Sequence, residues 1–444
     1  MRALGIDFGT TNSALAIVDD NGQPQLAHFA DGRGTTDTFR SILYFAPWSM
    51  RGAQTADGIV AGPEAIRRYR EAHPKGRFIQ SLKTYLGDST FTGTLIGGKR
   101  RSLEELIGLI LQRLLAAGND ALGPLPSRAV VGRPVHFTAA CSAKDDELAV
   151  GRLRTALAMA GIKEPVFEYE PVAAAYAYRQ RLQKPATVLI GDFGGGTSDF
   201  SILSLQPLSA VAQGGKAEPG VTASDGIAIL GSDGLAIGGD RFDQLIVRHA
   251  VAPQLGKGSE YLSPPDKILP TPEWVYAKLE RWHHLSFLKS SPTIEMLERV
   301  QRTSTARDAI SALLHVIDED LGYELHEQVN TTKAALSAAL EAEFHFELSP
   351  VNINWPATRA EFEEFLAPDL AALDNCVAGL LERTGLTAST IDTVFLTGGS
   401  SYVPSVRRIF EARFPDAKIT GGEELTSVAT GLALKAAELI TSSD

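Results

Sequence analysis

Two short stretches of the sequence combine aspartates with glycines and hydroxyl side chains, a combination suited to phosphate and metal chemistry. Residues 191–199 read Gly-Asp-Phe-Gly-Gly-Gly-Thr-Ser-Asp, with Asp192 and Asp199 on either side of three glycines. Glycines permit tight turns and leave no side chain to block a ligand, so backbone N–H groups there could cradle a phosphate. A cation would then be needed between phosphate and carboxylates, and Mg²⁺ prefers such oxygen ligands. Taken alone, an acidic glycine-rich turn without a ligand fits this stretch equally well.

The same construction occurs near the amino-terminal end. Residues 4–13 read Leu-Gly-Ile-Asp-Phe-Gly-Thr-Thr-Asn-Ser and lead into a second apolar run, 14–18, so that Asp7 corresponds to Asp192. Internal repeats set the architecture of a chain. Two such turns favour a duplicated fold in which phosphates are held between two facing hairpins.

The chemistry that these residues could support is phosphoryl transfer, which needs charge neutralisation, positioned oxygens and an oriented water. Asp7, Asp192 and Asp199 could hold Mg²⁺ directly or through its waters. The backbone of the two turns could hold phosphate oxygens, and Thr197 could orient a nucleophile. A P-loop fold is disfavoured, because residues 256–259, Gly-Lys-Gly-Ser, do not have the required spacing.

The surrounding pattern predicts the elements that position these residues. Apolar and β-branched runs on both sides of each turn predict β-hairpins. Farther along, the pattern predicts another hairpin over 226–239, helices through most of 274–342, and a helix over 359–383 that Pro368 bends or splits. Other predicted elements are strands over 129–134 and 393–397 and helices over 103–117, 145–160, 172–182, 404–413 and 427–440.

Composition limits the classes of function. The chain has 444 residues, is 44% hydrophobic and 21% charged, and carries a net charge of −11. This charge argues against bulk binding to nucleic acid or to an anionic membrane, but not against a nucleotide bound with Mg²⁺. Cys141 and Cys376 are far apart in sequence, which argues against a disulfide framework or a structural zinc site. We expect a cytoplasmic protein without a signal peptide or membrane span.

Several motifs resemble the nucleotide-binding domain of DnaK-type heat-shock chaperones, in the actin/hexokinase/heat-shock ATPase superfamily. The phosphate motifs, the connecting motif, the segment entering the nucleotide-facing lobe and the adenosine motif occur in the family's order at residues 7–13, 192–199, 170–178, 238–243 and 394–401. The resemblance implies an α/β, duplicated ribonuclease-H-like fold with two lobes and four subdomains around a nucleotide cleft. The subdomains implied are 1–36 with 120–184, 37–119, 185–238 with 358–444, and 239–357.

The resemblance also implies ATP or ADP with Mg²⁺ and assigns roles to residues. Lys83 matches the family's catalytic lysine, Glu170 a carboxylate that orients water, and Thr197 a threonine beside the γ-phosphate, with Asp192 completing the catalytic set. Asp7, Asp192 and Asp199 are the implied metal residues. By themselves, Lys83 reads as a surface lysine and Glu170 as a favourable carboxylate at a helix N-terminus. The implied nucleotide contacts are Gly9, Thr10, Thr11, Asn12, Gly194, Gly195, Gly196, Thr197, Gly238, Gly239, Lys333, Ser337, Gly398, Gly399 and Ser400.

The sequence also departs from the family pattern. Ala334 and Tyr402 stand where the family has arginines near the adenosine, and Asn330 where it has a glutamate toward the ribose. Residues 250–332 form an enlarged insertion, and the sequence ends soon after the last expected ATPase helix, so we expect no peptide-binding domain. Within the family, the sequence most resembles short chaperone-like proteins of the YegD type.

Three functions remain open. The first is a Mg-ATP-binding and slowly hydrolysing chaperone-like protein, whose nucleotide state changes the angle between two lobes and is sensed by an unknown protein client or partner. The second is a small-molecule kinase of the sugar-kinase type with the same superfold. The third is a nucleotide-dependent scaffold or reactivating factor that does not hydrolyse ATP. None of these needs a nucleic acid or a membrane as partner.

Overall fold

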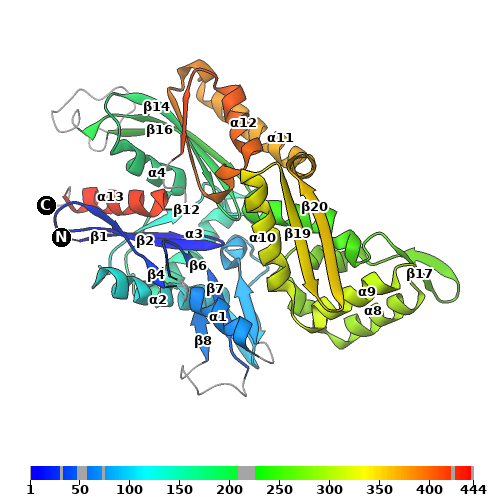
Figure 1. Ribbon diagram of the computed structural model, residues 1–444. Coiled ribbons are helices and arrows are strands. Elements are labelled where there is room, and N and C mark those ends of the chain that lie inside the picture. The colour runs from blue at the N-terminus through cyan, green and yellow to red at the C-terminus, as the bar shows by residue number, and fades with distance from the viewer. Residues whose placement is uncertain are drawn as a thin grey trace. The chain divides into compact units, whose positions relative to one another are not determined.

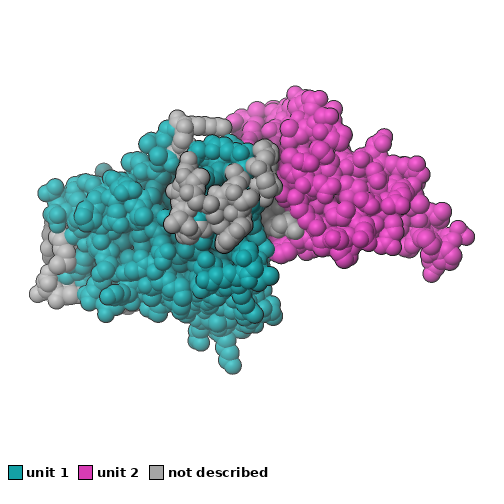
Figure 2. All heavy atoms as spheres, turned by 90° about the horizontal axis from the view of Figure 1, so that it is seen from below, with its two compact units in different colours: residues 1–239, 371–402, 406–444 teal, residues 240–370, 403–405 magenta. Residues whose placement is uncertain are grey.

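The structure is a computed structural model that describes residues 2–30, 34–47, 58–72, 76–208, 226–421 and 426–441, without the side chains of Trp282, His283 and Ser286. The chain divides into two compact units. Unit 1 holds residues 1–239, 371–402 and 406–444, and unit 2 holds residues 240–370 and 403–405 (Figure 2). Each unit is described below by itself.

Unit 1 contains two five-strand sheet arrangements with the same topology. The first has the order β13-β12-β1-β2-β3, in which β1, β2 and β3 form an antiparallel meander and β12 and β13 run parallel to β1. The second has the order β16-β15-β14-β21-β22, with the same directions. The strands are β1 (Ala3–Phe8), β2 (Asn12–Val18), β3 (Pro24–Leu26), β12 (Val130–Arg133), β13 (Val166–Tyr169), β14 (Ala186–Phe193), β15 (Ser198–Leu205), β16 (Ile227–Leu235), β21 (Thr393–Thr397) and β22 (Lys418–Gly421).

The helices repeat as well. A helix joins the two parallel strands of each sheet, α3 (Ala143–Met159) in the first and α12 (Pro404–Arg413) in the second. Another helix follows the last parallel strand, α4 (Glu170–Arg179) in the first half and α13 (Ser427–Thr441) in the second (Figure 1). The chain therefore contains two copies of one α/β unit, which confirms the predicted duplicated ribonuclease-H-like fold.

Small residues allow helices α4 and α13 to pack closely within unit 1. A Cβ atom on Gly431 of α13 would overlap the carbonyl group of Ala173 on α4, and a Cβ on Gly5 of β1 would overlap the backbone of α13. Alanines of β2, α4 and α13 share one buried apolar cluster with Val188 and Ile190 of β14. The opposite face of β1 and β2 carries large side chains, which pack with α2 (Leu103–Leu122) and α3 in a second cluster. Side-chain size thus separates the two faces of the first sheet.

The other described elements of unit 1 form small sheets and one helix. A three-stranded sheet has the order β8-β7-β9, and β10 pairs with β11 as a hairpin. The remaining elements are β4 (Phe29–Ala30), β5 (Thr35–Thr36), β6 (Phe39–Arg40), β7 (Ile42–Phe45), β8 (Ile59–Ala61), α1 (Pro63–Glu71), β9 (Arg77–Gln80), β10 (Gly93–Ile96), β11 (Lys99–Ser102) and the 3₁₀ turns Leu82–Tyr85, Ala388–Thr390 and Gly399–Tyr402.

Unit 2 combines helices with two hairpins. β17 pairs with β18 and β19 with β20, both antiparallel. The elements are α6 (Gly239–Ile246), a π-helical turn Val247–Val251, 3₁₀ segments Ala252–Leu255 and Trp282–Lys289, β17 (Glu260–Ser263), β18 (Lys267–Pro270), α7 (Glu273–Leu279), α8 (Ser291–Thr303), α9 (Arg307–Asp318), α10 (Gly322–Ala338), β19 (Glu341–Leu348), β20 (Val351–Thr358) and the start of α11 (Arg359–Thr384). Within the described residues, no helix is both long and apolar enough to cross a membrane.

Three local predictions differ from the structure in whole or in part. Residues 226–239 do not form a hairpin of their own, because β16 is a single strand that extends the second sheet by pairing with β15. Pro368 does not split α11, which is one continuous helix. Phe362 and Leu366 before the proline and Leu373 after it are buried, so packing on both sides outweighs one lost backbone donor. The predicted helical region ends before residue 342, because β19 begins at Glu341.

Candidate functional site

Each of the two glycine-rich turns closes a hairpin at the end of its sheet. The first joins β1 to β2, and Asp7 on β1 pairs with Ala14 on β2. The second joins β14 to β15, and there Asp192 pairs directly with Asp199 across the strands. The Gly194 N–H donates to the Thr197 carbonyl oxygen over 2.9 Å and closes this turn.

The two turns lie against each other within unit 1. A Cβ atom on Gly196 would come within 2.8 Å of the Thr10 Oγ1, so any larger residue at this position would displace the Thr10 side chain. Other predicted glycines converge on the second turn. A Cβ on Gly238 would lie 2.6 Å from the Gly195 carbonyl oxygen, and the Gly239 N–H donates to the Gly194 carbonyl over 3.0 Å.

Two further predicted segments adjoin these turns. Gly398, with φ +84°, begins the predicted Gly398–Ser400 segment, and its Cα lies against the backbone of Phe193 at the end of β14. On the first turn, the Asn12 Oδ1 accepts a hydrogen bond from Arg40 over 3.1 Å, and the Thr11 carbonyl accepts one from the Ser41 N–H over 2.9 Å. The backbone and side chain of the first turn are therefore held by the segment around β6.

Lys83 and Glu170 form a buried ion pair beside the aspartates. The Lys83 Nζ lies 2.6 Å from the Glu170 Oε1, and each side chain is only 8% exposed. Lys83 sits on the 3₁₀ turn Leu82–Tyr85, and Glu170 is the first residue of α4. Gly132 on β12 makes room for this carboxylate, because a Cβ there would lie 3.2 Å from the Glu170 Cγ.

The electrostatics show an excess of negative charge at this place. Burial, together with Glu170, raises the pKa of Asp7 to about 7. The same two causes raise the pKa of Asp199 to about 7, and they raise the pKa of Asp192 well above its usual range. Burial alone would lower the pKa of Lys83, but the neighbouring carboxylates outweigh it and the net shift is upward. One ammonium group therefore faces four carboxyl groups.

These residues fit a divalent cation that shares its coordination with phosphate and water. The Asp199 Oδ2 is buried and has no hydrogen-bond partner among the described residues. The described part of the chain holds no group of three histidine, cysteine, aspartate or glutamate residues arranged to bind a metal unaided. Mg²⁺ usually binds through one or two carboxylates and completes its shell with waters and substrate phosphates. The site therefore offers a buried oxygen donor and an excess of carboxyl groups over cationic side chains, both of which favour the binding of a divalent cation.

The predicted nucleoside residues lie on α10 in unit 2. Lys333 and Asn330 share one partner, since the Lys333 Nζ lies 2.7 Å from the Asp243 Oδ1 and the Asn330 Nδ2 donates to the Asp243 Oδ2 over 3.0 Å. The Ser337 Oγ donates to the Lys333 carbonyl over 3.1 Å. Asp243 therefore orients the lysine in a way that the sequence pattern did not reveal. Tyr402 lies in unit 1 and is 56% exposed.

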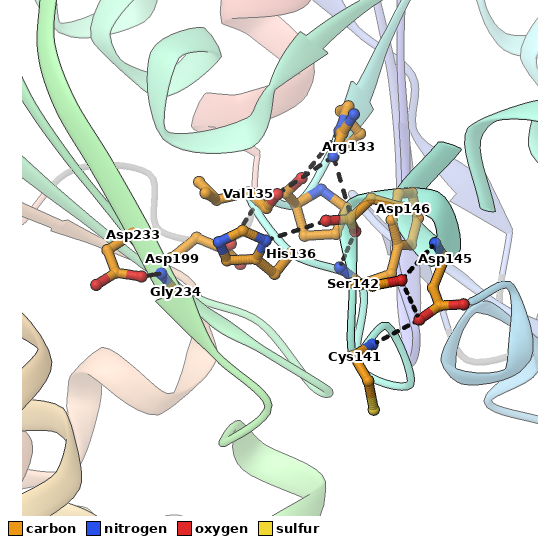
Figure 3. A network of polar contacts seen from close by, with 12 residues as sticks. Arg133, Val135, His136, Cys141, Ser142, Asp145, Asp146, Asp199, Asp233 and Gly234 are labelled. Carbon is orange, nitrogen blue, oxygen red and sulfur yellow. Dashed lines mark hydrogen bonds and ion pairs between the residues drawn. The ribbon is translucent and has the colours of Figure 1, made fainter. Parts of the chain in front are cut away.

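The structure adds residues that sequence reasoning missed. The Val135 N–H, in the loop after β12, donates to the Asp199 Oδ1 over 2.7 Å (Figure 3). Gly234, opposite Asp199 on β16, leaves space for the same carboxylate, because a Cβ there would lie 2.7 Å from the Oδ1. Thr138 approaches Gly196, with its Oγ1 3.3 Å from where a Cβ would stand. A backbone donor has no sequence signature, but a glycine inside a strand, as at 132 or 234, indicates a close approach.

Duplicated sheets of this topology, with acidic turns meeting where the two copies adjoin, define the actin, hexokinase and heat-shock ATPase class of fold. The sequence model described as "Hsp70 protein" matches residues 80–259 and 316–444, and the chain belongs to the Hsp70 family. The match leaves out residues 1–79, which contain the first glycine turn, and residues 260–315, which contain β17, β18, α7, the 3₁₀ segment Trp282–Lys289, α8 and the start of α9.

Two curated relatives support the same assignment. The chain is 26% identical over 452 aligned positions to "Chaperone protein DnaK" from each of two strains of Thermus thermophilus. The alignments cover 99% of this chain and 61% of each relative. The chain therefore spans about three fifths of the length of these relatives.

Proposed function

We propose that the protein binds ATP or ADP with Mg²⁺ at the two glycine turns of unit 1 and hydrolyses ATP slowly, as a chaperone-like nucleotide switch. The observation that carries this proposal is the buried Lys83–Glu170 pair beside three buried aspartates whose pKa values are raised. Membership of the Hsp70 family supports it, since members of that family bind ATP or ADP with Mg²⁺.

The proposed division of labour follows from position and charge. Asp7, Asp192 and Asp199 hold Mg²⁺ directly or through its waters, and the metal neutralises phosphate charge when bound. The Lys83 ammonium stabilises the charge that develops on the transferred phosphoryl group. Glu170 fixes that ammonium over 2.6 Å and helps to orient the attacking water.

The remaining nucleotide contacts are proposed from the two turns and from α10. Backbone N–H groups of residues 9–12 and 194–197 hold phosphate oxygens, with Thr197 beside the γ-phosphate. Gly238, Gly239 and the Gly398–Ser400 segment complete this part of the site. Lys333, oriented by Asp243, and Ser337 contact the nucleoside.

We further propose that nucleotide state changes the angle between two lobes, and that a protein client or partner senses this change. The lobes are those of the subdomain boundaries given above, and the proposal assigns no role to a peptide-binding domain. The enlarged insertion, residues 250–332, is the proposed contact for the partner, and its central part, residues 260–315, lies outside the family match. The cytoplasm is the proposed compartment, since both cysteines are free thiols.

Steady-state ATP hydrolysis with excess Mg²⁺ tests this function. Wild-type protein should release phosphate slowly, Lys83→Ala should lose turnover while it keeps most nucleotide affinity, and the exposed-site control Lys99→Ala should match wild type. Turnover that rises on addition of a sugar or polyol, with a phosphorylated product, would establish the kinase alternative instead. Nucleotide binding without any hydrolysis would establish the scaffold alternative.

A further inference from the structure

The loop from Pro134 to Thr138 reaches the proposed metal and phosphate site from β12. Its Val135 N–H donates to the Asp199 Oδ1 over 2.7 Å, and its Thr138 hydroxyl adjoins Gly196. Asp199 is 1% exposed, so this N–H is a buried donor that fixes one oxygen of the carboxylate. The other oxygen, Oδ2, is left without a hydrogen bond among the described residues. The position of this loop therefore contributes to the orientation of the Asp199 carboxylate, together with the Thr197 side chain, which also lowers the pKa of Asp199.

Asp146, in the first turn of α3, holds the loop from the side opposite Asp199 (Figure 3). Its Oδ1 accepts a hydrogen bond from the Phe137 N–H over 3.0 Å, and its Oδ2 lies 3.1 Å from the His136 Nδ1. The guanidinium of Arg133 lies 3.9 Å from the same carboxylate. The Asp146 side chain is 15% exposed, whereas that of His136 is 54% exposed, so the contact with the Phe137 N–H is the better shielded of the two hydrogen bonds.

Arg133 connects the loop with the residue before Glu170. It donates to the carbonyl oxygens of Pro134 and Val135 over 3.1 and 3.2 Å. Its guanidinium lies over the rings of Phe137 and Tyr169, at 5.4 and 5.1 Å from their centroids. Cation–π contacts of this kind orient an arginine as well as hold it. Arg133 contacts the Pro134 and Val135 carbonyl oxygens, and Asp146 contacts His136 and the Phe137 N–H. The loop is therefore held on both sides of the Val135 N–H.

We propose that Asp146 is a positioning residue for Mg²⁺ binding, which acts through the 134–138 loop on the Asp199 carboxylate. The inference rests on the proposed function, because it concerns the same site. Outer partners that orient metal ligands affect metal affinity without touching the metal. Asp146 never contacts the nucleotide in this proposal.

The neighbouring Asp145 provides a matched control. It is the same residue type in the same helical turn, but its Oδ2 accepts hydrogen bonds from the Cys141 N–H over 3.0 Å and from the Ser142 hydroxyl over 2.8 Å. Both contacts belong to the cap of α3. Replacement of either aspartate removes a carboxylate from the first turn of the helix, but only replacement of Asp146 releases the part of the loop that reaches Asp199.

The test is calorimetric titration of ADP, with Mg²⁺ and with EDTA, into full-length wild type, Asp146→Ala, Asp146→Asn and Asp145→Ala. Asp146→Ala should weaken Mg-ADP binding about tenfold or more, the range that outer partners of metal ligands show, and leave metal-free ADP affinity unchanged. Asp146→Asn keeps an acceptor for the Phe137 N–H but loses the charge facing Arg133, so it should fall between wild type and Asp146→Ala. It is also the variant that keeps the shape of the side chain if alanine impairs folding.

Two results would overturn the inference. If Asp146→Ala and Asp146→Asn both bind Mg-ADP as wild type does, the contacts of Asp146 with the loop do not position Asp199 for Mg²⁺. The same holds if Asp146 variants weaken Mg-ADP and metal-free ADP by the same factor, because the loop would then act on general stability. Absence of Mg-ADP binding by wild type would be a separate result, which overturns the proposed function together with this role.

Discussion

Asp192 and Asp199 face each other as a directly paired couple across β14 and β15. Like charges directly opposite on neighbouring strands destabilise a sheet. Both side chains are buried, and Lys83 is the cation that lowers the pKa of each of them. A bound cation would offset the repulsion between the two carboxylates. We therefore expect the stability of the protein to depend on pH and on Mg²⁺ through this one site.

Stability of the ligand-free protein should fall as pH rises toward neutrality. The pKa values of Asp7 and Asp199 rise from 3.8 to about 7, chiefly through burial. A carboxyl group with a raised pKa binds its proton more tightly in the native state than in the unfolded state. Its contribution to the free energy of unfolding is therefore complete below pH 3.8 and is lost as the pH approaches 7. Thermal unfolding measured from pH 3.8 to about 7 should show a smaller decrease in stability for Asp199→Asn than for wild type. Identical pH profiles would contradict the assignment.

Asp199→Asn should stabilise the ligand-free protein and remove its stabilisation by Mg-ADP. The amide oxygen can still accept from the Val135 N–H, and the repulsion with Asp192 disappears. We expect a higher free energy of unfolding without ligand and loss of the added stability that Mg-ADP confers on wild type. Denaturant titration with and without Mg-ADP measures both effects, and Asp120→Asn, at an exposed helix position, is the control. A variant that is less stable and still gains from Mg-ADP would refute this prediction.

Lys83→Met should destabilise the ligand-free protein. Removal of one partner from a buried ion pair commonly costs about 3–5 kcal/mol, because the other charge is left uncompensated. The double variant Lys83→Met/Glu170→Gln should lose much less than the sum of the two single variants. Chemical denaturation of all four proteins gives the coupling energy. Additive losses would mean that the two side chains do not act as a pair.

The α4–α13 contact predicts opposite effects of alanine at two helical glycines. Gly431→Ala would bring a methyl group into the Ala173 carbonyl, whereas a Cβ on Gly151 of α3 meets no atom within 4 Å. Gly431→Ala should therefore destabilise the protein, and Gly151→Ala should stabilise it by about 0.5–1 kcal/mol through helix propensity. Melting temperatures of the two variants provide the measurement. A neutral Gly431→Ala would show that the two helices are farther apart than described.

Much of unit 1 could be predicted from local patterns. The two glycine turns and their apolar flanks indicated hairpins, and β21 and α12 occupy the predicted ranges 393–397 and 404–413. The β19–β20 hairpin was missed, although burial alternates along both strands with period two. Its sequence adjoins a long helical stretch, which concealed the change of period.

The site was less accessible to pattern reasoning. Lys83 and Glu170 are 87 residues apart, and no spacing rule joins them, so the expectation that they act together came from the family resemblance. The Val135 N–H and the clamp at Asp146 depend on the path of a loop after β12. That path follows from the packing of Arg133 on Tyr169, a tertiary contact that local sequence does not encode.

The most direct test of the central claim is calorimetric titration of ATP into the Lys83→Ala variant, which should not consume it, with Mg²⁺ and with EDTA. We predict one binding site per chain that is substantially tighter with Mg²⁺, and loss of this Mg²⁺ dependence when Asp199→Asn is added. No heat of binding under either condition, together with none for wild type and ADP, would contradict the account.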